Sequence, residues 1–460
     1  MHTQSSFRLL VVRLGAMGDI LHALPAVTAL RQTHPAWHIG WVVEPRWQAL
    51  LKTGNEGPRD QGTEKTGNEG PRDQGTEKAG SEGAREQGSE KTGNEGPRDQ
   101  GTEKAGREGA REQGSEKTGN EGPRDQGTEK AGNEGPRDQG TEKAGSEGAR
   151  EQGSEKASAS EGRGSAMPVV DRLHFAASRE WKRHPLNGKT RSAIKGLRRE
   201  LRDAHYDAVL DLQGAIRSAV IGRMTGCMRR IGEARPREWP AHWFFTERIV
   251  THGAHVIEQD VELASAVAGD PLTAVSPLLP VDPVAESWCG NWLAEHAAQT
   301  GSRQIAFITP GAGWGAKRWP PERYAAVAKG LKDRGMQVLV NAAPGEESLA
   351  APIAADGAAV PIATTLPQLI ALTRRIALCI GGDTGPLHLA SALGRPVVGI
   401  YGPTDPSRNG PYGTRARVLR SPESRRDHSR RDAPEAGLLT ISPEDVLRAT
   451  DELLAEEKTA

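Results

Sequence analysis

Cysteine is scarce in this chain: its 460 residues include three cysteines, and none of them has CxxC or other metal-binding spacing. The scarcity argues against both a disulfide framework and a zinc site, and it suits a reducing cytoplasm. Long hydrophobic runs are missing as well, because Arg13 and Asp19 interrupt the first apolar stretch well short of a membrane span. The leading MHTQSSF has no signal-peptide pattern. We therefore expect a soluble, cytoplasmic protein.

Aromatic residues are also few, at 4% of the chain, whereas glycine occupies 55 positions. Residues 53–156 explain both figures, since they form eight tandem copies of a thirteen-residue unit such as TGNEGPRDQGTEK or AGSEGAREQGSEK. The segment has no Val, Ile, Leu, Met, Phe, Trp, Tyr or Cys. Because it has nothing to bury, it cannot offset the entropy of ordering its backbone, and the composition predicts disorder.

The repeat has three interpretations: a solvated tether, a module that recruits a partner, or an in-frame expansion tolerated in a surface loop. A collagen or a solenoid is excluded, because glycine is not at every third position and no unit has an apolar face. We interpret the repeat as a passenger insertion. Its net charge is −7, so the rest of the formally neutral chain carries +7.

The sequence also lacks two nucleotide-binding signatures. It has no Walker A loop and no dinucleotide-type GxGxxG, which argues against kinases and nicotinamide-dependent enzymes. Basic residues, Arg191 among them, gather along WKRHPLNGKTRSAIKGLRRELR. They form either a solvated helix face or a surface that favours an anionic acceptor or an anionic membrane. No aromatic platforms interleave with them, so we expect no nucleic-acid partner.

Outside the repeat, apolar runs alternate with helical patterns, which is typical of βαβ units and parallel sheets. We predict strands at 9–14, 38–43, 207–212, 304–309, 337–341, 377–380 and 397–401, and helices at 20–32, 191–205, 321–334, 385–393 and 442–457. A proline-punctuated linker near residues 279–282 divides the chain into two doubly wound α/β domains, 1–278 and 279–460. Two such domains would face one another across a cleft.

The stretch RLGAMGDILHALPAV places Asp19 in a glycine-containing turn between the first strand and the first helix. Near a helix N-terminus an aspartate commonly acts as a cap. The same position is the carboxyl end of a strand, where open parallel sheets bind ligands, so Asp19 is also a candidate catalytic base. Position alone leaves both interpretations open.

A second motif, CIGGDTGPLH, again joins a strand to a helix. The backbone N–H groups of Thr384 and Gly385 suit an anion such as phosphate, whereas the carboxylate of Asp383 suits sugar hydroxyls. The alternative is that Asp383 or Thr384 caps the helix and that His388 faces inward to a carbonyl.

Two further loops follow predicted strands. In TPGAGWGAKRWP, Lys317 and Arg318 offer cations for a diphosphate, unless they are solvated residues of a glycine-rich turn. In NAAPGEE, Glu346 and Glu347 come to the same edge of the sheet, where acids commonly meet ribose or sugar hydroxyls. A solvated acidic helix start explains the pair equally well.

Five segments occur in a fixed order: MGDILHALPAV, WVVEPRW, YDAVLDLQGAIRSA, GAGWGAKRWPPERY and GDTGPLHLASALGRPVVGIYGPTDP. Together they resemble family 9 glycosyltransferases, and most of all the type I lipopolysaccharide heptosyltransferases. The resemblance covers the chain except for the repeat. The loop GAGWGAK departs from the type I pattern, because threonines often precede the lysine there, and this departure concerns the identity of the sugar more than the reaction.

The resemblance implies a GT-B fold of two Rossmann-like domains, the first binding acceptor and the second binding nucleotide sugar. It implies inverting transfer of L-glycero-D-manno-heptose from ADP-heptose to a Kdo residue of the lipopolysaccharide inner core, carried on lipid A, with no cofactor and no obligatory metal. The match makes Asp19 the base and assigns the donor to Lys317, Asp383, Thr384, Gly385, His388 and Glu346, with Glu347 as an alternative to Glu346. The acceptor-binding candidates are Gly18, Arg191 and Gln213.

We expect a monomer that can contact the cytoplasmic face of the inner membrane, with a C-terminal helix that packs back onto the first domain. Three other functions stay open. The chain could catalyse a different family 9 step, such as that of a type II heptosyltransferase. It could instead bind a nucleotide sugar without catalysis, or serve as an adaptor through its repeat.

Overall fold

The computed structural model describes residues 6–52, 168–297, 304–427 and 429–459, which belong to one compact unit. The repeat at 53–156, predicted to be disordered, lies outside the described residues. Each of the three cysteines is buried and free.

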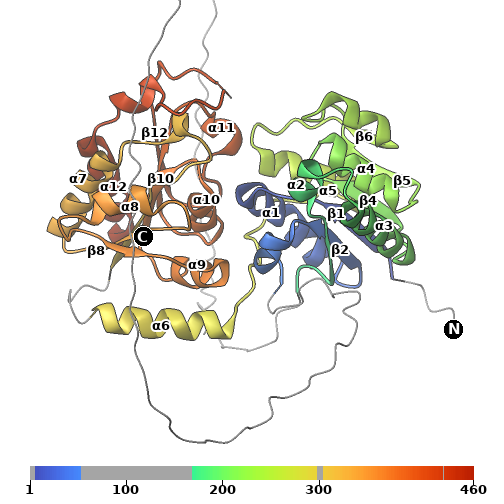
Figure 1. The fold of residues 1–460 in the computed structure, drawn as a ribbon, viewed down its shortest axis with the longest axis horizontal. Helices are drawn as coiled ribbons and strands as arrows, with labels where there is room; N and C mark the ends of the chain where they lie inside the picture. The colour runs from blue at the N-terminus through green and yellow to red at the C-terminus, as the bar shows by residue number, and fades with distance from the viewer. Residues whose placement is uncertain (1–5, 53–167, 298–303, 428, 460) are drawn as a thin grey trace, which may run out of the picture. The chain divides into compact units, whose positions relative to one another are not determined.

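The described residues form two six-stranded sheets in which every pairing is parallel (Figure 1). The first sheet has the order β3-β2-β1-β4-β5-β6, built from β1 (Arg8–Val12), β2 (His38–Val43), β3 (Arg172–Phe175), β4 (Ala208–Asp211), β5 (Arg229–Glu233) and β6 (Glu247–Ile249). The second has the order β12-β11-β10-β7-β8-β9, built from β7 (Ile305–Thr309), β8 (Gln337–Asn341), β9 (Val360–Ile362), β10 (Leu378–Gly382), β11 (Val397–Tyr401) and β12 (Ala416–Arg420). Two doubly wound α/β domains are thereby confirmed, while the boundary at 278/279 stays a prediction.

The central strands are apolar because both faces of each sheet are covered. In β1, Leu9 and Val11 face one hydrophobic cluster, and Leu10 and Val12 face another. The alternation follows from the two-residue period of a strand.

One of these clusters runs from the first sheet to the second. It includes side chains from α1 (Met17–Thr33), α5 (Val256–Ala268), α9 (Leu366–Thr373) and α10 (Gly385–Ala392). Helix α1 packs on α5 and also on α10. The helix that carries Asp19 therefore touches the helix that follows Asp383.

The remaining helices are α2 (Ser178–Arg183), α3 (Gly188–Asp203), α4 (Ile216–Met224), α6 (Pro283–Ala297), α7 (Pro321–Asp333), α8 (Glu347–Ala354), α11 (Pro406–Asn409) and α12 (Pro443–Thr459), with 3-10 turns η1 (Pro45–Leu50), η2 (Trp239–Phe244), η3 (Gly315–Lys317) and η4 (Ala436–Thr440). Instead of the expected packing onto the first domain, α12 packs on α7 and β12 (Figure 1). The reason is that Val446, Ala449 and Leu453 are buried in the outer core of the second sheet.

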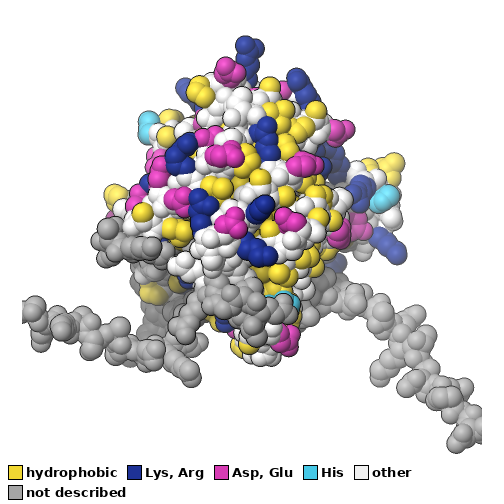
Figure 2. All heavy atoms as spheres, turned by 90° about the vertical axis from the view of Figure 1, so that its left-hand side faces the viewer, with side chains coloured by type: hydrophobic (Ala, Val, Ile, Leu, Met, Phe, Trp, Pro, Cys, Tyr) yellow, Lys and Arg dark blue, Asp and Glu magenta, His cyan; other side chains and the backbone are white. Residues whose placement is uncertain are grey.

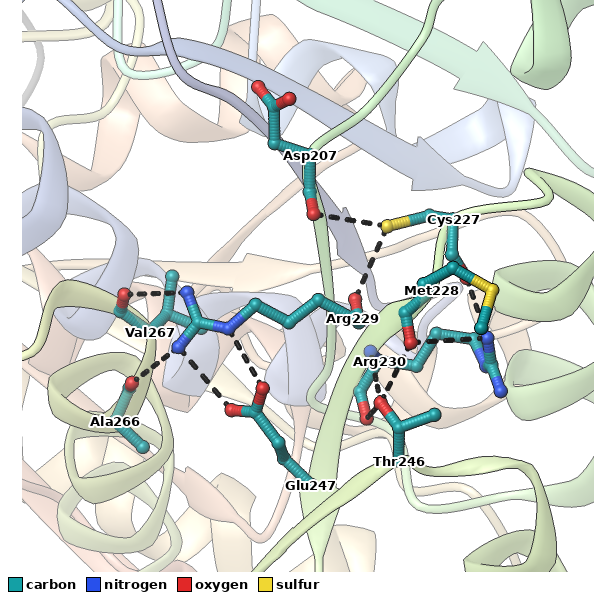
Figure 3. A network of polar contacts seen from close by, with 9 residues as sticks. All are labelled: Asp207, Cys227, Met228, Arg229, Arg230, Thr246, Glu247, Ala266 and Val267. Carbon is teal, nitrogen blue, oxygen red and sulfur yellow. Dashed lines mark hydrogen bonds and ion pairs between the residues drawn. The ribbon is translucent and has the colours of Figure 1, made fainter.

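The side chain of Arg229 joins the edge of the first sheet to helix α5 (Figure 3). Arg229 on β5 donates to both carboxylate oxygens of Glu247 on β6, at 2.9 and 3.3 Å. Its other N–H groups donate to the carbonyls of Ala266 and Val267 at the end of α5. This network fixes the C-terminal turn of α5, the helix whose other end lines the site described below.

The surface nearest α7 and α12 carries basic and acidic side chains side by side rather than in separate patches (Figure 2). One such pair joins Arg334, at the C-terminal end of α7, to Asp451 of α12. The Arg334 Nε and Asp451 Oδ1 atoms are 2.7 Å apart. Exposed pairs of this kind contribute little to stability.

Candidate functional site

The strand order of each sheet reverses at one point, between β1 and β4 in the first sheet and between β7 and β10 in the second. Open α/β sheets bind ligands in the crevice at such points, outside the carboxyl ends of the strands. The loops after these four strands line one shared cleft of about 1050 Å³. Its walls include predicted residues from both sheets: Gly18, Asp19, Gln213, Lys317, Glu346, Asp383, Thr384, Gly385 and His388.

Asp19 both caps α1 and faces this cleft. Its Oδ2 accepts the Ala16 N–H at 2.8 Å, and its Oδ1 lies 3.4 Å from Arg13 Nη2. The side chain is 31% exposed, so solvent and ligands can reach the carboxylate. Capping and an accessible base are thus compatible, and the two interpretations left open by the sequence are not exclusive.

On the opposite wall, Asp383 holds two cationic or proton-donating side chains. Lys317 Nζ pairs with its Oδ2, and His388 Nε2 lies 2.9 Å from its Oδ1. Burial by itself would raise the pKa of Asp383, but His388 and Lys317 outweigh burial and hold that pKa below its ordinary range. Asp383 is therefore an ionised side chain that fixes the position of Lys317, and His388 faces this carboxylate rather than a carbonyl.

The remaining residues of this wall fit an anionic ligand. Thr384 caps α10, its hydroxyl accepting the Leu387 N–H at 3.4 Å. Lys317 Nζ lies 4.3 Å from the centre of the Trp314 ring, a cation–π contact that further restricts the lysine. A restricted cation beside a helix N-terminus suits a phosphate group.

Of the two glutamates in NAAPGEE, Glu346 lines the cleft and Glu347 does not. Burial raises the pKa of Glu346, and the nearby Arg318 partly opposes this. Gly311 permits the approach of Glu346, because a Cβ there would lie 2.1 Å from Oε1. Glu347 instead accepts the Gly345 N–H at 2.9 Å.

The three predicted acceptor-binding residues have different surroundings. Gln213 lines the cleft, but its Oε1 accepts the Leu14 N–H at 3.0 Å and so holds the β1–α1 loop. At Gly18 a Cβ would lie 2.8 Å from His388 Cδ2, so this glycine permits α1 to approach α10. Arg191 is exposed on α3 and is not among the residues that line the cleft. Their acceptor-binding roles stay predictions.

Arg191 lies on the solvated face of α3, because Leu197 and Leu201 turn the other face of that helix toward the first sheet. Arginines that the sequence did not single out line the cleft instead: Arg46, Arg179 and Arg237, which follow β2, β3 and β5. Arg46 Nη2 and Arg179 Nε lie 2.8 and 3.7 Å from Glu44 Oε2. Their positions after strand ends were the signal that could have found them.

Two buried carboxyl groups of the first domain, those of Asp211 and Asp260, also line the cleft. Burial raises the pKa of Asp211 to about 6, although the Gly214 and Gln213 N–H groups and Ser218 stabilise its charge. Burial raises the pKa of Asp260, on α5, to about 7. Oδ2 of each residue is buried without a hydrogen-bond partner among the described residues.

Among the described residues, no group of three or more His, Cys, Asp or Glu side chains could hold a metal ion. That the reaction requires no metal or cofactor stays a prediction. In the same part of the chain, no helix has the length and apolar character needed to cross a membrane.

A protein-family comparison matches residues 194–438, more than half of the chain, to "Glycosyltransferase family 9 (heptosyltransferase)". The chain belongs to glycosyltransferase family 9. Among curated relatives, lipooligosaccharide heptosyltransferase 2 of Haemophilus influenzae is 28% identical over 277 residues, covering 55% of this chain and 77% of the relative. Lipopolysaccharide heptosyltransferase 1 of Pseudomonas aeruginosa is 28% identical over 252 residues, covering 54% and 68%.

Solved structures support the fold. A family 9 glycosyl transferase from Veillonella parvula has a TM-score of 0.63 and 17% identity, covering 98% of both chains. Escherichia coli ADP-heptose heptosyltransferase II has a TM-score of 0.59 and 18% identity, covering 98% of this family 9 chain and all of its own. The two domains thus have the GT-B arrangement of heptosyltransferases.

Proposed function

We propose that this family 9 member is an inverting glycosyltransferase that moves L-glycero-D-manno-heptose from ADP-heptose to a Kdo residue of the lipopolysaccharide inner core. One observation carries the proposal: an accessible carboxylate, Asp19, and an anchored cation, Lys317, line the same cleft from opposite sheets. A base on one wall and an anion site on the other are what a direct displacement needs.

In the proposed reaction, Asp19 removes the proton from the acceptor hydroxyl. The acceptor oxygen forms a bond to the anomeric carbon while the bond from that carbon to the ADP phosphate breaks on the opposite face. The bonding electrons leave with ADP, a stable anion that needs no protonating acid. Lys317 and the N–H groups at the start of α10 stabilise the charge that develops.

The donor-binding roles follow from the contacts on the second wall. Asp383 uses its two oxygens to hold Lys317 and His388, so it acts mainly through Lys317 rather than as a free acceptor for sugar hydroxyls. Glu346 reaches the cleft where the loop after β8 ends, and we assign it to hydroxyls of the donor.

The acceptor side carries cations suited to an anionic sugar. Arg46 and Arg179 share Glu44 and are 44% and 63% exposed, so both retain N–H groups for a ligand. Arg237 adds a third guanidinium after β5. Guanidinium groups bind carboxylates in a two-point geometry, and a Kdo residue presents such a carboxylate.

A type II step, in which the acceptor is a heptose already attached, is the second candidate. Relatives named as heptosyltransferase 2, from Haemophilus influenzae and Escherichia coli, are as similar to this chain as those named heptosyltransferase 1, at 28% identity. The loop GAGWGAK, which lacks the threonines frequent in type I enzymes, also agrees with this alternative.

The deciding experiment incubates the purified protein with ADP-heptose and either Kdo-bearing lipid A or the same acceptor with one heptose attached. Mass spectrometry of the products should show one added heptose on the first acceptor only. Addition to the second acceptor alone would establish the type II step, and no addition to either would contradict the proposed function. ADP-glucose serves as the donor control.

We extend the proposal to three properties of the protein. The reaction proceeds without a metal, so chelation with EDTA should leave the rate unchanged. The protein acts as a monomer, which light scattering would show. It works at the cytoplasmic face of the inner membrane, where its lipid-linked acceptor is found, and sedimentation with anionic vesicles would detect that contact.

A further inference from the structure

Three histidine rings meet where α1, α5 and α10 come together. The ring centres of His22 and His388 are 4.5 Å apart with an interplanar angle of 72°, and those of His22 and His255 are 5.5 Å apart at 80°. All three side chains are buried. His22 lies one helical turn after Asp19 and lines the cleft, yet neither the capping of α1 nor the proposed chemistry uses it.

The other two rings, those of His255 and His388, differ in how many of their nitrogens have a hydrogen-bond partner. His255 caps α5, since its Nδ1 accepts the Ile257 N–H at 3.2 Å and its Nε2 lies 3.1 Å from the Gly410 carbonyl. His388 uses Nε2 for Asp383, and its Nδ1 is buried without a hydrogen-bond partner among the described residues. The orientation of His388 therefore depends on one hydrogen bond and on what packs against its ring.

His22 is the ring that packs there, and its surroundings keep it uncharged. Burial lowers the pKa of His22 well below its ordinary value, and His388, His255 and Arg13 lower it further, against a weaker opposite effect of Asp383. A neutral imidazole can meet His388 edge to face without charge repulsion, as aromatic pairs prefer. Other titratable or charged groups around the cluster are Asp19, one turn before His22, Glu258 and Arg408, which act on His255, and Tyr412, whose ring centre lies 4.8 Å from that of His255.

We propose that His22 is a positioning residue of the donor site, whose ring holds the His388 imidazole so that Nε2 stays on Asp383 and Asp383 stays on Lys317. This inference rests on the proposed function, because it assumes that Lys317 meets the diphosphate of the donor. The contacts form an unbroken series from α1, which carries the base, to the cation on the opposite wall.

The test compares ADP binding and transfer kinetics in His22→Ala, His22→Phe and wild type, with His34→Ala as control. His34 lies at the far end of α1, stacked on Trp37 and away from the cleft. Loss of the ring in His22→Ala should weaken ADP binding roughly 10-fold and raise the KM for ADP-heptose more than it lowers kcat. His22→Phe keeps an aromatic ring and should stay within about 3-fold of wild type, with an unchanged pH profile of ADP affinity, because a neutral His22 contributes no titration.

Several outcomes would overturn the inference. His22→Ala could bind ADP as wild type does, or His22→Phe could be as weak as His22→Ala, which would assign the effect to the ring nitrogens instead. If His22→Ala does not fold, His22→Asn removes the ring while keeping a polar group, and a crystal structure of that variant should show His388 Nε2 displaced from Asp383. If the wild-type protein binds ADP but transfers no heptose, the proposed function alone is contradicted. If the wild-type protein does not bind ADP, both the proposed function and the role of His22 are contradicted.

Discussion

At the residue scale, the substitution that best separates the two roles of Asp19 is Asp19→Asn. The amide oxygen of asparagine can still accept the Ala16 N–H, so the cap survives, but asparagine cannot remove a proton. We expect kcat to fall on the order of 10²- to 10⁴-fold, the usual contribution of a general base. ADP affinity, measured by calorimetry, should stay as in wild type.

The companion variant Asp19→Ala removes the cap as well as the base. It should lose the same turnover and, in addition, about 1 kcal/mol of unfolding free energy. A parallel collapse of ADP affinity in both variants would instead indicate that Asp19 acts by shaping the loop and not as the base.

Asp260 gives a prediction about pH and stability. Burial raises its pKa to about 7, with Arg13 opposing and Asp19 and Glu233 reinforcing the shift. A folded carboxyl whose pKa exceeds its unfolded value binds more protons when folded, so its contribution to stability is present below the unfolded pKa and is lost as pH rises through the folded one. Asp260→Asn is neutral at every pH and should avoid that loss.

The expected gain in unfolding free energy for Asp260→Asn is on the order of a few kcal/mol at about pH 8, at about 1.4 kcal/mol for each pKa unit, and near zero at about pH 4. Thermal melts of wild type and variant across that range measure it. The exposed Asp270→Asn should show no such divergence. Equal Tm differences at both ends of the range would show that Asp260 does not titrate between them.

At the element scale, the contact between α1 and α10 brings Asp19, near the first sheet, close to Asp383 and Lys317, near the second sheet. A Cβ on Gly18 would lie 2.8 Å from His388 Cδ2, and one on Gly385 would lie 2.7 Å from Met17 Sδ. Both glycines stand in the first turn of a helix, where alanine would otherwise be favourable. Their small size, rather than backbone freedom, is what this junction requires.

We therefore expect Gly18→Ala to push the His388 ring away from Asp383 and to weaken ADP binding roughly 10-fold, a coupling typical of residues in contact. Gly196→Ala is the matched control: it lies within α3, a Cβ there meets nothing within 4 Å, and it should gain up to about 1 kcal/mol without affecting binding. Gly18→Ala with full ADP affinity would show that the helices can separate at no cost to the donor site.

The elements and loops could be predicted where the signal is local. Strands 38–43, 337–341 and 397–401 match β2, β8 and β11 to the residue, because each is a buried run with clear ends. Asp383 was found because it directly follows a strand, β10, and Asp19 was found because it lies close to the glycine-containing connection between β1 and α1. The contact of His22 with His388 could not be predicted this way, because it joins two helices that are far apart in the sequence. In the sequence pattern, His22 is not distinguished from the other buried positions of its helix.

At the scale of the whole molecule, the basic stretch that contains Arg191 shows that a run of positive charge in the sequence does not have to line the cleft. The basic side chains of this stretch are exposed to solvent. The arginines that line the cleft come instead one at a time from loops after different strands. Basic residues that are neighbours in the sequence are therefore not the basic residues that are neighbours around the cleft. Only the strand order, known once the sheet is assembled, relates Arg46, Arg179 and Arg237.

The last prediction concerns the repeat and the described residues on either side of 53–167. Leu50 and Leu51 before it, and Val169 and Val170 after it, are buried in the same hydrophobic cluster. Arg31 donates to the Val169 carbonyl and pairs with Asp171, which also accepts the Ile39 N–H at 2.7 Å. The described residues on either side of 53–167 are therefore held by the first domain itself.

Deleting residues 53–156 leaves 157–167 to connect these anchors. If the repeat is the flexible passenger that its composition predicts, the deletion shortens the connection by about three doublings and should raise the unfolding free energy by on the order of 2 kcal/mol, at about 0.6 kcal/mol for each doubling. Heptose transfer should stay within about 3-fold of the full chain, since every residue of the cleft remains. Loss of transfer in a deletion variant that still melts cooperatively would show that the repeat takes part in the reaction, either by recruiting a partner or by holding the acceptor.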